Sequence, residues 1–263
     1  MKHAIYVVDA FTDCPYGGNP AAVCLLDQEA ESDWMQSIAA EMNLSDSAFL
    51  LPGNPGEWSL RWFTPKVEVD LCGHATLASA HVLWRELGVE GKQLLFHTRS
   101  GQLAATREAE VIALDFPTDN LASIPISERL IESLGIEPET AYKGREDILV
   151  ALKHADELRC LKPDLARMMS LKCRGVIVTA PSDRPAYDFI SRFFGPRIGI
   201  PEDPVTGSAH CSLAPFWAER LGKATMRGFQ ASSRGGVVNV QHLGERVKLL
   251  GQAVTTLSGK LHA

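Results

Sequence analysis

The hydrophobic pattern of this chain consists mostly of short apolar runs bounded by Gly, Pro, Asn and Asp, which are typical of β-strands. In the first half, the predicted strands are Ile5–Val8, Ala21–Leu26, Ala48–Leu51, Trp58–Phe63, Leu94–His97, Gln102–Thr106 and Val111–Phe116. In the second half, they are Asp147–Leu152, Gly175–Thr179, Ala186–Phe194, Val237–Val240, Arg246–Leu250 and Ala253–Leu257.

Helical periodicity is confined to fewer segments. The first half contains two, Ser32–Met42 and Ala75–Leu87, in which apolar residues recur at helical spacing. The second half contains Ser127–Leu134, Pro163–Ser170 and Ala209–Leu221. Strands therefore dominate. The pattern predicts an α+β fold without the βαβ alternation that would indicate a parallel sheet.

Two stretches about half a chain apart resemble each other. Arg61–Pro65 (RWFTP) is similar to Arg192–Pro196 (RFFGP), 131 residues later. Gly73–Ala75 is similar to Gly207–Ala209, 134 residues later, and each opens a predicted helix of the same length. A duplicated strand, loop and helix predicts two similar domains; the alternative is coincidence between two amphipathic helices.

The sequence Asp115-Phe-Pro-Thr-Asp interrupts the strand pattern near the middle of the chain. We expect a domain boundary there, with an N-terminal domain of residues 1–116 and a C-terminal domain of residues 117–252. The strand-like segment 253–263 is a candidate to complete the N-terminal domain.

Composition narrows the class of protein. The chain is 45% hydrophobic and 22% charged, with a net charge of −6, which argues against a surface that binds nucleic acid or membranes. Its six cysteines include no C-x-x-C pair, so neither a zinc motif nor a disulfide framework is predicted. No signal-peptide core or long apolar segment is present, and we expect a cytoplasmic protein with reduced thiols.

Both repeated loops end in a glycine-containing turn that runs directly into a helix. The first turn of a helix carries unpaired amide groups and a partial positive charge, and glycine allows a ligand to approach them. Two such turns facing one cleft would bind an organic carboxylate through the amides of Gly73, Gly207 and Ser208. They would also stabilise negative charge that develops when a proton leaves beside that carboxylate.

The side chains near these turns suit proton transfer. His74 lies at a helix start, where the local field favours a neutral imidazole. Asp46 precedes an apolar strand, a setting that suits a carboxyl group acting as acid or base. Asp203 precedes a proline that restricts its backbone, and hydroxyls follow at Thr206 and Ser208.

Each of these residues also has a plainer interpretation. Asp46 and Asp203 are residue types that form turns, and a histidine at a helix start often caps or packs. A cysteine such as Cys72 is more often a small buried hydrophobic residue than a nucleophile, and Asn19 is a loop residue type that tolerates left-handed backbone. Their shared position at duplicated turns favours the functional interpretation.

Five ordered motifs that span nearly the whole chain resemble the PhzF-like (phenazine biosynthesis) isomerase family. They are Asp9-Ala-Phe-Thr with Gly18-Asn-Pro-Ala21, Asn43-Leu-Ser-Asp-Ser-Ala-Phe49, Phe63-Thr-Pro65, Asp70-Leu-Cys-Gly-His-Ala-Thr76 and Glu202-Asp-Pro-Val-Thr-Gly-Ser-Ala209. The resemblance implies a diaminopimelate-epimerase-like fold, in which two similar domains each curl a sheet around a central helix and enclose the active site between them. It also implies a cofactor-independent enzyme, often a homodimer, that isomerises a dihydroxyanthranilate-type acid with a glutamate as proton shuttle.

The sequence departs from the family pattern at two positions. Asp46 stands where the shuttling glutamate is expected, which shortens the reach of the carboxylate by about 1.3 Å and puts the phenazine-pathway substrate in doubt. Related epimerases and proline racemases carry a cysteine at each helix start, whereas this chain has Cys72 at the first and Thr206 at the second. A Cys/Thr pair resembles hydroxyproline dehydratases.

The resulting hypothesis is an isomerase or epimerase-like enzyme that moves a proton on a small carboxylic acid. Asp46 is the expected proton shuttle. His74 and Asp203 orient the substrate and assist, while Asn19, Cys72 and Thr206 contact it. A Cys72/Thr206 dehydratase or racemase-like enzyme and a catalytically silent binding protein are the alternatives. No metal or cofactor is expected, because no His/Cys/Asp cluster has ligand spacing along the chain and no nucleotide-binding motif occurs.

Overall fold

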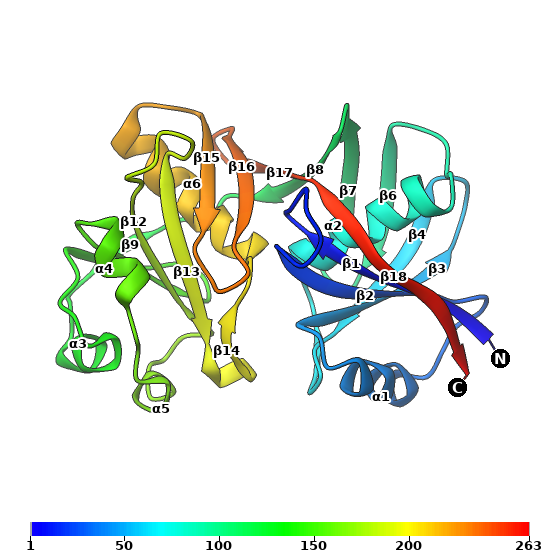
Figure 1. The fold of residues 1–263 in the computed structure, drawn as a ribbon, viewed down its shortest axis with the longest axis horizontal. Coiled ribbons are helices and arrows are strands. Elements are labelled where there is room, and N and C mark those ends of the chain that lie inside the picture. Colours follow the sequence, from blue (N-terminus) through cyan, green and yellow to red (C-terminus); the bar gives the residue numbers. More distant parts are fainter. Residues whose placement is uncertain (1, 263) are drawn as a thin grey trace. The chain divides into compact units, whose positions relative to one another are not determined.

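A computed structural model describes residues 2–262, and the chain divides into two compact units (Figure 1). Unit 1 comprises Met1–Phe116 together with Lys248–Ala263, and unit 2 comprises Pro117–Val247. The first strand, β1 (Lys2–Ala10), pairs antiparallel with the last, β18 (Ala253–His262). The end of the chain therefore completes the sheet of unit 1.

Unit 1 is a curled mixed sheet around a central helix, with a second helix outside (Figure 1). The central helix α2 (Gly73–His81) continues into a π-helical turn, η1 (Val82–Glu86), and the outer helix is α1 (Ser32–Met42). The other strands are β2 (Asn19–Leu25), β3 (Asp46–Pro52), β4 (Glu57–Phe63), β5 (Glu68–Val69), β6 (Gln93–Thr98), β7 (Gly101–Glu108), β8 (Val111–Pro117) and β17 (Arg246–Gly251), which carries the chain back from unit 2.

Unit 2 has the same plan. Its central helix is α6 (Gly207–Leu221), and its shorter helices are α3 (Glu128–Leu134), α4 (Ala155–Cys160), α5 (Leu165–Met168) and the 3₁₀ turn η2 (Pro196–Ile198). Its strands are β9 (Ala122–Ile124), β10 (Thr140–Lys143), β11 (Ile148–Ala151), β12 (Val176–Pro181), β13 (Phe189–Gly195), β14 (Ile200–Asp203), β15 (Thr225–Gln230) and β16 (Gly236–His242).

The strand pairing confirms the duplication that the sequence predicts. In unit 1, β1/β2 is antiparallel, β2/β3 parallel, β3/β4 antiparallel and β4/β6 parallel. In unit 2, the same order recurs as β10/β11, β11/β12, β12/β13 and β13/β15. The parallel pairs correct one expectation: α1 joins β2 to β3 in a βαβ arrangement, which the many short strands around it conceal in the sequence.

Both central helices are buried because of their composition. All residues of α2 from Gly73 to Ala80 are buried, and most are small, so the helix packs closely against β1, β2 and β3. A helix that is apolar on every side belongs in a core. The predicted helices begin two residues too late, at Ala75 and Ala209, because a glycine start gives no helical signal.

An identical ion pair holds the corresponding strand in each unit. Arg61 on β4 donates to both carboxylate oxygens of Glu68 on β5, at 2.7 and 2.9 Å. Arg192 on β13 donates to both oxygens of Glu202 on β14 at the same two distances. Such two-pronged pairs fix geometry as well as adding energy. They set the path of the chain into each central helix.

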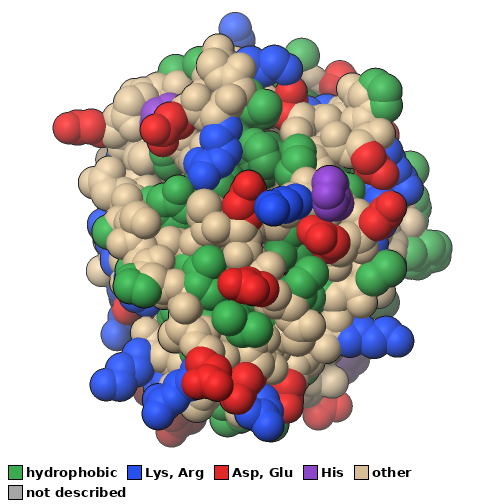
Figure 2. Space-filling view, turned by 90° about the vertical axis from the view of Figure 1, so that its left-hand side faces the viewer, with side chains coloured by type: hydrophobic (Ala, Val, Ile, Leu, Met, Phe, Trp, Pro, Cys, Tyr) green, Lys and Arg blue, Asp and Glu red, His purple; other side chains and the backbone are tan. Residues whose placement is uncertain are grey.

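The sequence misses short elements such as β5, β9, β10, β14 and α4, since so few residues show no periodicity, and it also misses the six-residue strand β15. No helix among residues 2–262 is long and apolar enough to cross a membrane. On the face drawn in Figure 2, acidic and basic side chains are interspersed, as the mixed charge runs of the sequence suggest.

Candidate active site

The candidate site in unit 1 forms where two strands and the central helix begin. Asn19 is the first residue of β2 and Asp46 the first of β3, and the parallel register places Asp46 opposite Ala21. Cys72 is the residue before α2, and His74 lies in its first turn. The fold thus gathers four predicted site residues from three distant segments.

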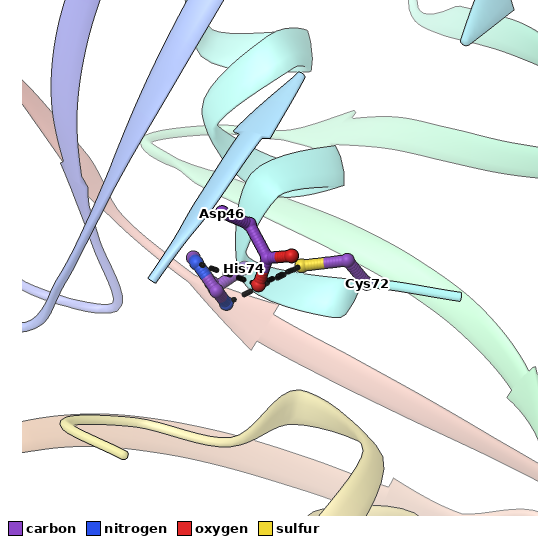
Figure 3. Close-up of side chains that lie close together, drawn as sticks. All are labelled: Asp46, Cys72 and His74. Atoms are coloured by element: carbon purple, nitrogen blue, oxygen red, sulfur yellow. Dashed lines mark hydrogen bonds and ion pairs between the residues drawn. The ribbon is translucent and has the colours of Figure 1, made fainter. Parts of the chain in front are cut away.

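Asp46, Cys72 and His74 are in mutual contact (Figure 3). The Cys72 thiol donates a hydrogen bond to Asp46 Oδ2 at 3.3 Å and lies 3.4 Å from His74 Nδ1. His74 Nε2 is 3.7 Å from the same Oδ2 atom. All three residues are buried, with exposed fractions of 6%, 7% and 3%. Two groups with exchangeable protons, the thiol and the imidazole, therefore converge on one carboxylate.

Burial sets the charge of His74. Loss of hydration lowers the pKa of its imidazole to about 3, so the ring is neutral near pH 7. The sequence predicts a neutral ring from the field at the helix start, whereas the cause in the structure is burial. Asn19 Nδ2 lies 3.2 Å from Nδ1 and donates to it when the ring proton is on Nε2. In that tautomer the Nε2–H faces Asp46. The histidine can therefore donate a hydrogen bond without carrying charge.

The first turn of α2, which holds His74, also carries backbone donors. Cys72 has extended backbone, and its carbonyl accepts the first intrahelical bond, from the amide of Thr76 at 3.2 Å. The backbone amides before that of Thr76, including the amide of Gly73, come too early in the helix to bind an intrahelical carbonyl. They are the donors to which an anion at a helix start binds.

Unit 2 places its predicted residues at the start of α6. Thr206 Oγ1 donates to Asp203 Oδ2 at 2.5 Å, and the Thr206 amide donates to Gln230 Oε1 at 2.8 Å. Gln230 in turn donates to the carbonyl of Asp203 at 2.8 Å. Gly207 and Ser208 form the first turn of the helix. This cluster is a closed network of hydroxyl, amide and carboxylate.

Sequence reasoning missed the partners of that helix start. Gln230 is fully buried on β15, and an isolated glutamine in a strand carries no signal in the sequence. Arg174 donates to Ser208 Oγ at 2.9 Å and to Asp147 Oδ1 at 2.9 Å. Burial disfavours the charge of Arg174, but the hydrogen bond and charge of Asp147 outweigh it and raise the arginine pKa.

One expectation needs correction. The sequence contains no His/Cys/Asp cluster with metal-ligand spacing along the chain, but the fold forms such a cluster in space. One ligand atom each from Asp46, Cys72 and His74 lies within 4.8 Å of the others. Asp46 is 26 residues before Cys72, so only the fold brings them together.

A sequence model of the family described as phenazine biosynthesis-like protein (PhzC-PhzF) matches residues 8–259. The chain belongs to the PhzF family. An uncharacterized isomerase of Halalkalibacterium halodurans is 48% identical over 263 residues, 99% of each chain. A PhzF-family crystal structure from Enterococcus faecalis superposes with a TM-score of 0.95 at 40% identity, covering all of both chains. The resemblance seen in the motifs is thus confirmed.

The fold extends beyond the PhzF family. A hydroxyproline epimerase from Agrobacterium vitis, solved with bound trans-4-hydroxy-L-proline, superposes with a TM-score of 0.64 over 99% of this chain and 92% of its own. At 10% identity the similarity concerns the fold alone. It confirms the predicted architecture, in which each domain of a diaminopimelate-epimerase-like protein wraps a sheet around a helix.

Proposed function

We propose that this protein is a cofactor-independent isomerase that moves a proton between two atoms of a small carboxylic acid. The contact between Asp46, His74 and Cys72 at the start of α2 supports this proposal. The names of similar proteins support the same class, since an uncharacterized isomerase is 48% identical along nearly the whole chain.

The roles follow from the chemistry of each group. Asp46 takes a proton from a carbon near the substrate carboxylate and returns it to another atom, as a general base and then a general acid. Neutral His74 donates its Nε2–H to charge that develops during the transfer. The amide of Gly73 binds the carboxylate or the enolate-like charge, and Asn19 holds the imidazole.

In unit 2 we assign supporting roles to the start of α6. Asp203 orients the substrate and assists proton transfer, with Thr206 fixing its carboxylate through their hydrogen bond. The amides of Gly207 and Ser208 offer the same anion-binding chemistry as those of α2.

Isotope exchange tests the proposal. Incubation in D₂O with a panel of small carboxylic acids, followed by mass spectrometry, should show enzyme-dependent uptake of deuterium. Asp46→Asn should slow uptake by about 10²–10⁴-fold, the usual contribution of a general base. Asp33→Asn, a change to an exposed carboxylate on α1, serves as the control and should leave the rate unchanged. Equal rates in wild type and Asp46→Asn would exclude Asp46 as the shuttle.

A second candidate is a dehydratase that uses Cys72 as the base that removes an α-proton. The position of the thiol within 3.4 Å of an imidazole nitrogen favours it. In this case Cys72→Ala abolishes turnover, iodoacetamide inactivates the enzyme, and the product has lost water. The proposed isomerase instead keeps the mass of its substrate apart from deuterium.

Two further proposals concern the oligomeric state of the protein and its location in the cell. We propose a homodimer, from the family resemblance, and a cytoplasmic location, because the cysteines among residues 2–262 form no disulfide. Sedimentation equilibrium tests the first and cell fractionation the second. A catalytically silent binding protein would instead bind acids from the panel without exchanging any proton.

A further inference from the structure

The cluster of Asp46, Cys72 and His74 combines the three side-chain types that bind zinc in proteins. In a tetrahedral site with bonds of about 2.0–2.3 Å, neighbouring ligand atoms lie about 3.3–3.8 Å apart. Cys72 Sγ is 3.3 Å from Asp46 Oδ2, and that oxygen is 3.7 Å from His74 Nε2. Two of the three separations therefore match those that coordination requires, and the sulfur also lies 3.4 Å from the other ring nitrogen, Nδ1.

The number and softness of the ligands indicate the kind of ion. Three protein ligands leave one position open, as in zinc sites that exchange a water. A thiolate favours Zn²⁺ or Co²⁺ over Mg²⁺, which prefers an all-oxygen shell. Carboxylate and thiolate together carry two negative charges, which match one divalent ion.

The surroundings also suit an imidazole ligand. A metal-bound histidine normally directs its other ring nitrogen at a hydrogen-bond partner that fixes the ring. Here Nε2 has no hydrogen-bond partner, while Nδ1 lies 3.2 Å from the side-chain amide of Asn19. If Nε2 binds the metal, Nδ1 carries the proton and donates it to the amide oxygen, after a rotation of the Asn19 amide that heavy-atom positions alone do not fix.

We propose that Asp46, Cys72 and His74 form a binding site for a Zn²⁺-like ion, and that the ion blocks proton transfer. On binding, the S–H bond of Cys72 breaks, a sulfur–metal bond forms, and the proton passes to the buffer. The metal replaces that proton as the partner of Asp46 Oδ2. The inhibitory part rests on the proposed function, because it requires Asp46 to be the group that carries the proton.

Cobalt substitution tests the site without any substrate. Titration of the full chain with Co²⁺ should produce a thiolate-to-cobalt absorption band that saturates at one ion per chain. Zn²⁺ should remove the band, because it binds more tightly than Co²⁺, whereas Mg²⁺ should not. Cys72→Ser should eliminate the band, and His74→Asn should weaken Co²⁺ binding at least tenfold.

Cys14 provides a matched control. Its thiol also donates to a carboxylate, Asp13 Oδ1 at 3.2 Å, but in an exposed position outside the Asp46–Cys72–His74 cluster. Cys14→Ser should therefore keep the full band. Circular dichroism establishes that each variant is folded. Absence of the band in wild type, its survival in folded Cys72→Ser, or its loss in Cys14→Ser overturns the proposal.

Deuterium exchange separates this proposal from the proposed function. Zn²⁺ should stop exchange in wild type, and a chelator should restore it. A cobalt band without exchange on any acid supports the metal site and contradicts the isomerase. Exchange that depends on Asp46, in a protein that gives no cobalt band, supports the isomerase and contradicts the metal site.

Discussion

The start of α2 in unit 1 and the start of α6 in unit 2 share a backbone frame but differ in chemistry. Cys72 and Thr206 precede the two helices with similar extended backbone, and neither makes a side-chain capping bond. Each helix follows a strand pair held by an Arg–Glu ion pair. The frame is thus duplicated. The side chains placed on it are not.

Register shows how far the two clusters have diverged. Arg61 lies opposite Phe49 and Arg192 opposite Val178, so the position of Asp46, three residues before Phe49, corresponds to Gly175. A Cβ atom at Gly175 would lie 2.3 Å from Phe193 Cζ, which leaves no room for a side chain. Unit 2 therefore cannot hold a carboxylate at this position. The comparison indicates that duplication preserved the scaffold, while the carboxylate at the start of β3, which we propose as the shuttle, is particular to unit 1.

The largest expected effect concerns the shared ion pairs. Arg192 has 12% side-chain exposure and also donates to the carbonyls of Leu158 and Leu161, so Arg192→Met leaves Glu202 and two carbonyls unpaired. We expect a loss of about 3 kcal/mol in unfolding free energy. Because the Arg61 side chain is 29% exposed, Arg61→Met should lower the unfolding free energy by less, about 1.5 kcal/mol. Urea denaturation measures both, and equal losses would show that the two frames are energetically equivalent.

A smaller effect separates the two residues that precede the helices. Thr206→Val removes the hydroxyl that donates to the buried carboxylate of Asp203. We expect this change to lower the unfolding free energy by about 2 kcal/mol. Cys72→Ala removes only a weak thiol donor and should cost about 1 kcal/mol or less. Thermal unfolding of both variants provides the measurement. A greater loss for Cys72→Ala would show that the thiol contact stabilises unit 1 more than the hydroxyl contact stabilises unit 2.

Much of this frame could be predicted from the sequence, because its signals are local. The two similar glycine-containing turns locate both helix starts to within two residues, and the motif that contains His74 and Cys72 is contiguous. The partners of these residues are set by long-range packing. Asp46 meets Cys72 because β2 and β3 pair in parallel, which the apolar runs do not encode. Gln230 reaches Asp203 across 27 residues, and a single buried glutamine has no pattern to reveal it.

A pH dependence of stability is the effect that both central helices should share. Burial lowers the pKa of His74 to about 3 and that of His210, on α6, to about 4, from 6.5. Below pH 6.5 the unfolded chain binds protons that the folded chain excludes, so stability is greatest above this pH and falls as pH decreases toward the folded-state values. Each histidine contributes a slope of about 1.4 kcal/mol per pH unit in this range.

Two variants divide this slope between the units. His74→Asn and His210→Asn each remove one titrating ring, and each should reduce the pH dependence of the unfolding free energy between about pH 6.5 and pH 5 by one such increment. Denaturation in urea at several pH values provides the measurement. Because His210 Nδ1 contacts the Thr206 carbonyl at 2.8 Å, its ring is held within the unit 2 network. If only His210→Asn changed the slope, His74 would titrate as a hydrated group, and the dry cluster argued for unit 1 would be wrong.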